Sequence, residues 1–463
     1  MNVLVSPDHR IRLLVQPADA AIAPELEVVF VGQAAETPAI DSAGAALAAA
    51  AALGFAPAAG DTTLNNLPLA FTDIGSFAAA FPGDDSWLAR AVRDYFAAGG
   101  LRAWVVRVAA NSAAPLDAYV SPGPSILASE PQNGVAIAAQ IPAAGLLVLP
   151  DLEYFCLAAT LPLPPPPPTP PVAAVFRPTR DFIAAPSAPR VQPTPATPIR
   201  PIDVLTRVSA TLAALRPDML CLFALPVGAD PTQSQPVLAK RAIAYVHGPA
   251  DPKNASGADM PQIQALAPLV QDVAGEIATP SGVVAGLLCA VAQSDGVWRS
   301  IAGRALPLGV TPLRRIESSA LALLRSSGIA VLQFTQGGTI LDDDILACQP
   351  NLPGAAQRRA APGRRLIGWL IRNLQQFGEQ LIFENVLDDG RVELVLTSLF
   401  AELFKRGALA GGQVSDAVRI TRRELGKRNA YAFDIAVATV VAVETIRLQF
   451  LDGALTTTLG AAP

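Results

Sequence analysis

Residues 363–421 decide the fold of the C-terminal part of the chain and read GRRLIGWLIRNLQQFGEQLIFENVLDDGRVELVLTSLFAELFKRGALAGGQVSDAVRIT. Apolar residues recur every three or four positions in two runs, which predicts two amphipathic helices around a Phe-Glu-Asn block. The expected buried positions are Leu366, Leu370, Ile371, Leu374 and Phe377 in the first helix, and Val392, Val395, Leu396, Leu399 and Leu403 in the second. Lys405 and Arg406 followed by Gly407 are typical of a helix C-terminus.

Two strand patterns follow these helices. In the first, Tyr431, Phe433, Ile435 and Val437 alternate with small or polar residues, which predicts a strand with one buried face. In the second, the alternating apolar residues are Ile446, Leu448 and Phe450. The parity of the apolar positions changes near Val441, so a turn or bulge is needed there to keep both apolar sets buried.

The chain before residue 350 predicts an α/β architecture. LEVVFVG at 26–32 is typical of a buried strand, and 69–108 has the order of a β-α-β unit, with Thr72 or Asp73 capping a helix. Between 201 and 334 helical and strand patterns alternate, and IQALAPLVQDVAGEI at 263–277 is expected to be a helix. The predicted fold class is α/β (α+β) and multidomain, with mixed sheets and helices.

A proline-rich stretch interrupts this pattern at 161–201. Its prolines remove backbone donors and favour an extended surface insertion, although its PxxP content leaves a signalling ligand open. The expected parts of the chain are an N-terminal arm and linker (1–24), a β-α-β part (25–110), a loop-rich and proline-rich insertion (111–200), a central α/β domain (201–350), a C-terminal domain (351–443) and a C-terminal arm (444–463).

Composition limits the function classes. Charged residues make up 16% of the 463 residues, below the usual quarter, and the net charge is −5 without a long basic block, which disfavours nucleic-acid binding. Four widely spaced cysteines predict buried free thiols in a reducing compartment. The N-terminus lacks the pattern of a signal peptide, and the alanine-rich run at 45–59 does not predict a membrane span.

Catalytic motifs receive little support. There is no GxxxxGK[ST] or GxSxG motif, and the two histidines are His9 and His247. PSGVVAG at 280–286 predicts a helix start, with phosphate binding as the weaker alternative. The acidic runs LDDD at 341–344 and LDDG at 387–390 lack the spacing of a calcium loop and predict solvated turns. Glu384 has no matched second carboxylate. We expect no catalytic residues, cofactor or metal.

Four blocks in order resemble contractile tail sheath proteins of phage tails and related injection particles. They are residues 69–108, 280–306, 319–334 and 363–421, a little under a third of the chain. The chain departs from the sheath pattern at its N-terminus, SPDHRIRLLVQP, where sheath proteins commonly carry a proline-glycine-valine-tyrosine-like arm. It departs again at FTQGGTILDDD (334–344), in place of an arginine-threonine-leucine-like stretch.

The resemblance implies an assembly function. Self-association into a helical array around an inner tube is expected, with baseplate and cap proteins as further partners, without nucleic acid and without membrane insertion. Residues 8–16 and 444–451 are predicted strand arms, and 430–439 a sheet that receives them. The arm residues are Ile11, Leu13, Val15, Ile446, Leu448 and Phe450, and the receiving residues are Tyr431, Phe433, Ile435 and Val437.

Further expectations concern the inner tube and the place of assembly. The resemblance implies that the C-terminal domain faces the tube, through Glu402, Lys405, Arg406, Asp416 and Arg419, although a solvated helix end explains these charges equally well. Assembly is expected in the bacterial cytoplasm, as part of a phage or phage-tail-like particle. Two alternatives stay open: a sheath-like cap or baseplate adaptor that does not polymerise, and an α/β enzyme with an unrecognised site.

Overall fold

The structure is a computed structural model of the 463-residue chain. It describes residues 3–5, 11–13, 26–34, 38–109, 115–122, 134–158, 199–230, 233–248, 259–273, 275–348, 358–382, 391–424, 431–439, 443–451 and 454–461. Most of the proline-rich stretch and the Phe-Glu-Asn block therefore lie outside the described residues.

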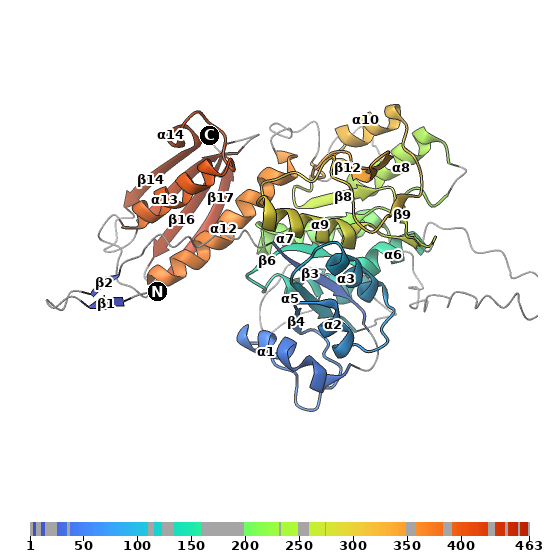
Figure 1. The fold of residues 1–463 in the computed structure, drawn as a ribbon, viewed down its shortest axis with the longest axis horizontal. Helices are drawn as coiled ribbons and strands as arrows, with labels where there is room; N and C mark the ends of the chain where they lie inside the picture. Colours follow the sequence, from blue (N-terminus) through green and yellow to red (C-terminus); the bar gives the residue numbers. More distant parts are fainter. Residues whose placement is uncertain are drawn as a thin grey trace, which may run out of the picture.

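The larger lobe is built on an eight-stranded sheet of order β13-β12-β8-β7-β6-β3-β5-β4 (Figure 1). Its strands are β3 (Glu27–Gly32), β4 (Pro68–Phe71), β5 (Ala103–Arg107), β6 (Ala144–Val148), β7 (Leu220–Ala224), β8 (Ile263–Ala267), β12 (Ile329–Thr335) and β13 (Gly338–Leu341). The inner strands pair in parallel, and the two edge strands β4 and β13 are antiparallel to their neighbours. The α/β class is confirmed. The ranges 25–110 and 201–350, expected as separate parts, contribute strands to this one sheet.

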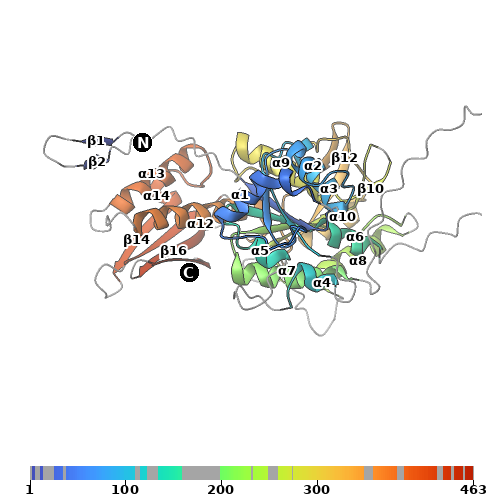
Figure 2. The same ribbon diagram turned by 90° about the horizontal axis from the view of Figure 1, so that it is seen from below.

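Helices cover both faces of this sheet (Figures 1 and 2). They are η1 (Ile40–Ala43), α1 (Gly44–Ala52), α2 (Ile74–Ala80), α3 (Trp87–Ala97), α4 (Pro115–Tyr119), α5 (Gly134–Ala138), α6 (Pro150–Ala158), α7 (Pro201–Leu215), α8 (Gln235–His247), α9 (Ser281–Ser294) and α10 (Ser318–Ser326). Along β3, Val28 and Phe30 belong to the same apolar core as residues of α2, α3 and α9, while Val29 and Val31 belong to a second core that contains residues of α5, α7 and α8. Burial on both faces explains why the parallel strands are continuous apolar runs.

The predicted helix at 263–277 is wrong. The structure has β8 there, followed by the short strands β9 (Val270–Gln271) and β10 (Ile277–Ala278), which form a small sheet with β11 (Thr311–Pro312). Pro268 has no amide hydrogen and disfavours a helix across this stretch. All five residues of β8 are buried, and β8 lies between β7 and β12 in the sheet. The apolar run at 263–267 suits a helix or a strand, and its place between these two strands makes it a strand.

The C-terminal module follows the long helix α12 (Ala361–Ile382) and lies to one side of the larger lobe (Figure 1). We define the module as α13 (Arg391–Lys405), α14 (Val414–Ala417), β14 (Val418–Glu424), β15 (Tyr431–Ala438), β16 (Val443–Leu451) and β17 (Ala454–Ala461). The four strands form an antiparallel sheet in chain order. β15 and β16 pair antiparallel, so the chain reverses direction between them; Val441, where a turn or bulge was predicted, lies outside the described residues. A separate hairpin pairs β1 (Val3–Val5) with β2 (Ile11–Leu13).

The block PSGVVAG forms the start of α9, as predicted, and its glycines allow close packing. A Cβ added at Gly286 would lie 2.4 Å from the carbonyl oxygen of Tyr95, in α3, and 2.6 Å from Cβ of Ala98, the residue directly after α3. A Cβ at Gly282 would lie 2.6 Å from the carbonyl oxygen of Ala91. These glycines therefore let α9 approach the backbone of α3.

We predict that Gly286→Ala lowers the free energy of unfolding by about 1–3 kcal/mol, because the added methyl group has no room between α9 and α3. Gly44→Ala is the matched control, since a Cβ at this helical glycine meets no atom within 4 Å. Its unfolding free energy should stay unchanged or rise by at most about 1 kcal/mol. Urea unfolding followed by circular dichroism measures both. Equal effects of the two substitutions would contradict the packing account.

Candidate assembly interface

The predicted arm and the predicted receiving strand lie side by side within this one chain. In the β15–β16 ladder Tyr431 pairs with Phe450, Phe433 with Leu448, and Ile435 with Ile446. Phe433, Ile435 and Val437 are buried, as predicted for one face of β15. Residues 444–451, expected to extend away as an arm, thus form an inner strand of their own module, with β17 as the edge strand beyond. Whether this strand also exchanges between subunits stays a prediction.

The N-terminal segment also pairs with itself in the single chain. Ile11 pairs with Val5 and Leu13 with Val3, while Val15 lies outside the described residues. Both views place this hairpin on the side of the C-terminal module (Figures 1 and 2). The sequence predicted a free strand here, and the structure shows a short two-stranded unit instead.

The helices over the module sheet largely follow the prediction. Leu366, Leu370, Ile371 and Leu374 of α12 are buried, with Phe377 half-buried against the same core. In α13, Val392, Leu396 and Leu403 are buried, and Leu399 is half-buried. The prediction that Val395 is buried is wrong, because this side chain is 37% exposed. Phe400 occupies the core position one turn after Leu396 instead. Leu394, at 66% exposed, lies on the same outward side as Val395.

The residues predicted to contact an inner tube are on the surface of this module. Glu402 and Arg406 form an ion pair at 2.8 Å near the end of α13, and the hydrogen bond from Arg406 lowers the pKa of Glu402. Lys405 is exposed beside them, and Gly407, with φ +72°, ends the helix. Asp416 lies in α14 and Arg419 in β14, both exposed. Their accessibility fits a partner contact as well as a solvated surface.

The two edge strands of the module sheet differ in sequence. β14 reads VRITRRE and exposes Arg419, Thr421 and Arg423. β17 reads ALTTTLGA and contains no charged residue. Charged side chains on an edge strand oppose pairing with a further strand, whereas an uncharged edge rich in threonine permits it.

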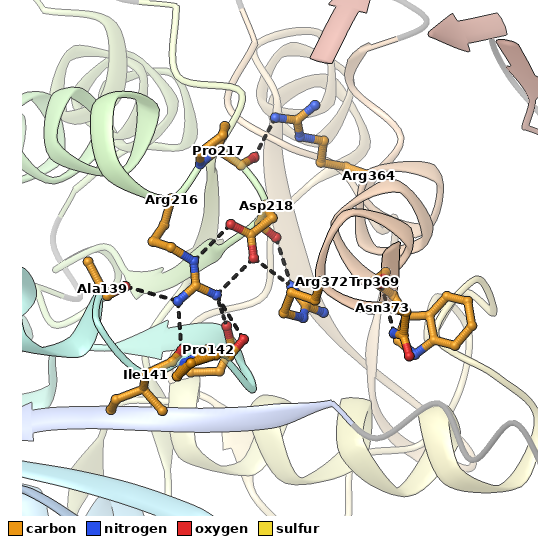
Figure 3. A network of polar contacts seen from close by, with 11 residues as sticks. Ala139, Ile141, Pro142, Arg216, Pro217, Asp218, Arg364, Trp369, Arg372 and Asn373 are labelled. Carbon is orange, nitrogen blue, oxygen red and sulfur yellow. Dashed lines mark hydrogen bonds and ion pairs between the residues drawn. The ribbon is translucent and has the colours of Figure 1, made fainter. Parts of the chain in front are cut away.

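A buried polar network joins α12 to the larger lobe (Figure 3). Nη1 of Arg372 donates to the main-chain oxygen and to Oδ2 of Asp218, both at 3.1 Å, and Arg216 holds the same carboxylate at 2.8 Å. Arg216 also donates to the carbonyl oxygens of Ala139, Ile141 and Ala144. Burial would raise the pKa of Asp218, but the hydrogen bond and charge of Arg216 and the charge of Arg372 outweigh it, so the pKa is lowered.

The close approach of α12 depends on glycine. A Cβ at Gly368 would lie 2.2 Å from the main-chain oxygen of Asp218, and one at Gly145 would lie 2.6 Å from Nη2 of Arg372. One turn before Gly368, Arg364 donates to the main-chain oxygen of Pro217 at 2.7 Å. The helix is therefore fixed by contacts that its amphipathic pattern did not reveal.

A second buried ion pair fixes the start of α12. Arg365 holds Asp344 through two hydrogen bonds of 3.0 and 2.7 Å, and Asp344 also accepts from the side-chain amide of Gln264. Burial opposes ionisation of Asp344, but the charge of Arg365 lowers its pKa below the ordinary value. The prediction of a solvated turn at 341–344 is wrong for this residue, which is 3% exposed. Residues 387–390 and Glu384 lie outside the described residues.

The described residues were also searched for groups that could bind a metal ion or act in catalysis. Within them, no group of three or more His, Cys, Asp and Glu side chains is arranged to hold a metal ion. Nε2 of His247 lies 2.7 Å from the main-chain oxygen of Ser327, and His9 is not described. All four cysteines are buried and free, as predicted. A search of the described helices finds none with the length and apolarity to cross a membrane.

We predict that Arg372→Met lowers the free energy of unfolding by about 3 kcal/mol, the lower end of the cost of breaking a buried ion pair, because Arg216 still pairs with Asp218. Arg200→Met is the control, since Arg200 forms an exposed pair with Asp203 and its loss should leave stability unchanged. Urea unfolding at neutral pH compares them. If the Arg372 variant is as stable as the Arg200 variant, α12 is not held by this network.

Comparison with known proteins connects this architecture to solved assemblies. No protein-family model and no curated protein sequence matches the chain. A sheath complex of the extracellular contractile injection system PVC, in the contracted state, is similar with a TM-score of 0.54 at 14% identity, covering 90% of this chain and 88% of that chain. A chain of the anti-feeding prophage (AFP) baseplate gives 0.54 at 16% identity, with 90% of each chain covered.

The helical sheath of the same prophage particle, in the contracted state, is also similar. Its TM-score is 0.52 at 17% identity, and the match covers 98% of this chain and 95% of that chain. The likeness therefore extends over both the larger lobe and the C-terminal module. At these identities it establishes the architecture, and the chain has the fold of contractile sheath proteins.

Proposed function

We propose that this chain is the repeating subunit of a contractile sheath, which polymerises helically around an inner tube and shortens to drive the tube through a target envelope. The observation that carries the proposal is the likeness to a contracted helical sheath over 98% of this chain. If the two proteins shared the larger lobe alone, the C-terminal module proposed for assembly would not be part of the match. The ordered sequence blocks between 69 and 421 support the same function independently.

Strand exchange between subunits is the proposed means of assembly. Residues 8–16 of one subunit, with Ile11, Leu13 and Val15, would add to the module sheet of a neighbour, and 444–451 could pair with a neighbour in the register seen with β15. The uncharged edge β17 favours strand addition, whereas the arginines of β14 oppose it. Main-chain hydrogen bonds would then link subunits in an array that does not close.

Contraction follows as a collective change between two states. In this proposal the extended array is metastable and the contracted array buries more surface, so no nucleotide is needed at the moment of firing. The strand pairs would persist while the larger lobes move relative to one another. No enzymatic activity and no cofactor are proposed. We infer assembly in the bacterial cytoplasm as part of a phage or phage-tail-like particle.

The inner tube, the baseplate and the cap are the proposed partners besides the chain itself. The charges of Glu402, Lys405, Arg406, Asp416 and Arg419 support a tube-facing surface, because they are accessible on one module. The second candidate function is a cap or baseplate adaptor that does not polymerise. It is favoured by the likeness to a chain of the prophage baseplate. Self-assembly separates the two candidates.

We predict that the purified full chain forms long tubes in negative-stain electron microscopy and that deletion of residues 1–16 abolishes them, because the strand-adding segment is lost. The deletion variant should keep the circular dichroism and urea midpoint of the full chain, since the described part of the segment pairs only with itself. Tubes of normal length from the deletion variant would contradict strand exchange by this segment. Soluble single subunits from the full chain would favour the adaptor.

A second prediction concerns the tube contact. Lys405→Glu with Arg406→Glu should reduce co-assembly with the inner tube at least tenfold in a sedimentation assay, because the surface charge is reversed. Arg200→Glu, on the exposed start of α7, is the matched control and should not change co-assembly. Equal co-assembly of both variants would remove these residues from the tube contact.

A further inference from the structure

Two acidic side chains fill the carboxyl edge of the eight-stranded sheet. β3 lies between β5 and β6, so the chain reverses its direction across the sheet at this point. In open α/β sheets the space outside the carboxyl ends of two such strands is the usual ligand site. Here α6 begins directly after β6, and its Asp151 and Glu153 are both 0% exposed in that space.

Each carboxylate connects α6 to two other elements. Oδ2 of Asp151 accepts hydrogen bonds from the main-chain N–H of Gln33, at the end of β3, and from the hydroxyl of Tyr119 in α4, both at 2.6 Å. Oε1 of Glu153 accepts from the N–H of Ala224, at the end of β7, at 2.8 Å. Oε2 accepts from the hydroxyl of Ser281, at the start of α9, at 2.7 Å.

Both carboxylates are held by neutral donors. Among the described residues neither forms an ion pair, and Oδ1 of Asp151 has no hydrogen-bond partner. The groups that face them from the surrounding elements are Gln33, Asp84, Tyr119, Ala224, Thr279 and Ser281. Arg90, which acts on the adjacent Tyr154, is already paired with Asp272 and Glu276. A buried carboxylate without a cation is costly in its ionised form.

The environment therefore favours the protonated acids. Burial raises the pKa of Asp151 to about 7 and that of Glu153 to about 8, against the lowering effect of their hydrogen bonds. The folded chain thus binds these two protons more tightly than the unfolded chain does. The stability that they contribute is fully present below pH 4 and is lost as the pH rises through about 7 and 8.

We propose that Asp151 and Glu153 form a protonation-dependent latch. In their neutral forms they hold the ends of β3 and β7 and the start of α9 together through α6. When they ionise, two negative charges without a cation lie in buried sites, with Asp84 acting against Asp151 and Asp151 against Glu153, and the edge of the sheet opens more readily. The latch belongs to the larger lobe and does not depend on whether the chain polymerises.

The test compares pH 5.5 with pH 8.5 in the full chain. Glu153→Gln keeps the shape: its amide oxygen can accept from Ala224, and its amide NH2 can donate to Ser281, whose hydroxyl can accept as well as donate. Its urea midpoint should exceed that of the wild type by a larger margin at pH 8.5 than at pH 5.5, because the wild type loses stability between the unfolded and the folded pKa of Glu153. At pH 8.5, hydrogen exchange measured by mass spectrometry should be at least tenfold slower in the variant for peptides covering 26–34 and 220–228. Asp151→Asn should act in the same direction.

Asp295→Asn is the matched control, because it removes an exposed carboxylate paired with Arg304 and should leave the pH profile unchanged. If the latch variants do not fold, hydrogen exchange of the wild type alone still tests the proposal. The amide of Ile301 donates to Asp344, a buried carboxylate that does have a cation. After correction for intrinsic rates, exchange at 220–228 should rise between pH 5.5 and pH 8.5 relative to 299–303. The proposal would be overturned if the latch variants differed from the wild type by the same amount at pH 5.5 and at pH 8.5. It would also be overturned if the difference in exchange between the peptides 220–228 and 299–303 of the wild type were the same at both pH values.

Discussion

The attachment of α12 to Asp218 joins the C-terminal part of the chain to the larger lobe. Every element of the C-terminal module follows α12 in the chain, so the position of this helix fixes where the module can lie. Asp218 is held from the lobe side by Arg216 and from the helix side by Arg372. Gly368 brings the helix backbone against the same residue. A force applied to the module would therefore reach the sheet through a short, buried and fully paired contact.

This attachment would matter in the proposed sheath, in which each subunit changes its contacts with neighbours. The larger lobe is a sheet covered on both faces, and its inner strands are buried except at the end of β12, where Phe334 is 67% exposed. The module sheet, in contrast, has two open edges of different character. We infer that rigidity resides in the lobe and its junction with α12, and that the capacity to join neighbours resides in the module.

The carboxyl edge of the large sheet supports the same view. In many α/β enzymes the space at such a reversal of strand order accepts a ligand. Here the donors that could bind one, the N–H groups of Gln33 and Ala224, are already satisfied by Asp151 and Glu153. The buried acids therefore occupy the place where chemistry would be expected in this architecture.

Local periodicity predicted much of the fold. The buried face of β15, the cap of α2 at Asp73 and the glycine stop at Gly407 all follow from short-range patterns. The strand at 263–267 could not be predicted in the same way, because its apolar run suits a helix or a strand and the choice depends on β7 and β12. The partners of Arg372 and Asp344 lie 154 and 21 residues away in the chain. A charged residue within an apolar stretch, such as Asp151 in LLVLPDLEYF, was the available signal of such sites.

If this chain joins others through its C-terminal module, a cryo-EM reconstruction of the particles formed by the purified full chain will show the joined strands. The account predicts an open helical array in which each module sheet contains strands from more than one subunit, beside an α12 still anchored at Asp218. A closed ring, or particles in which every strand of the module sheet comes from a single chain, would contradict it.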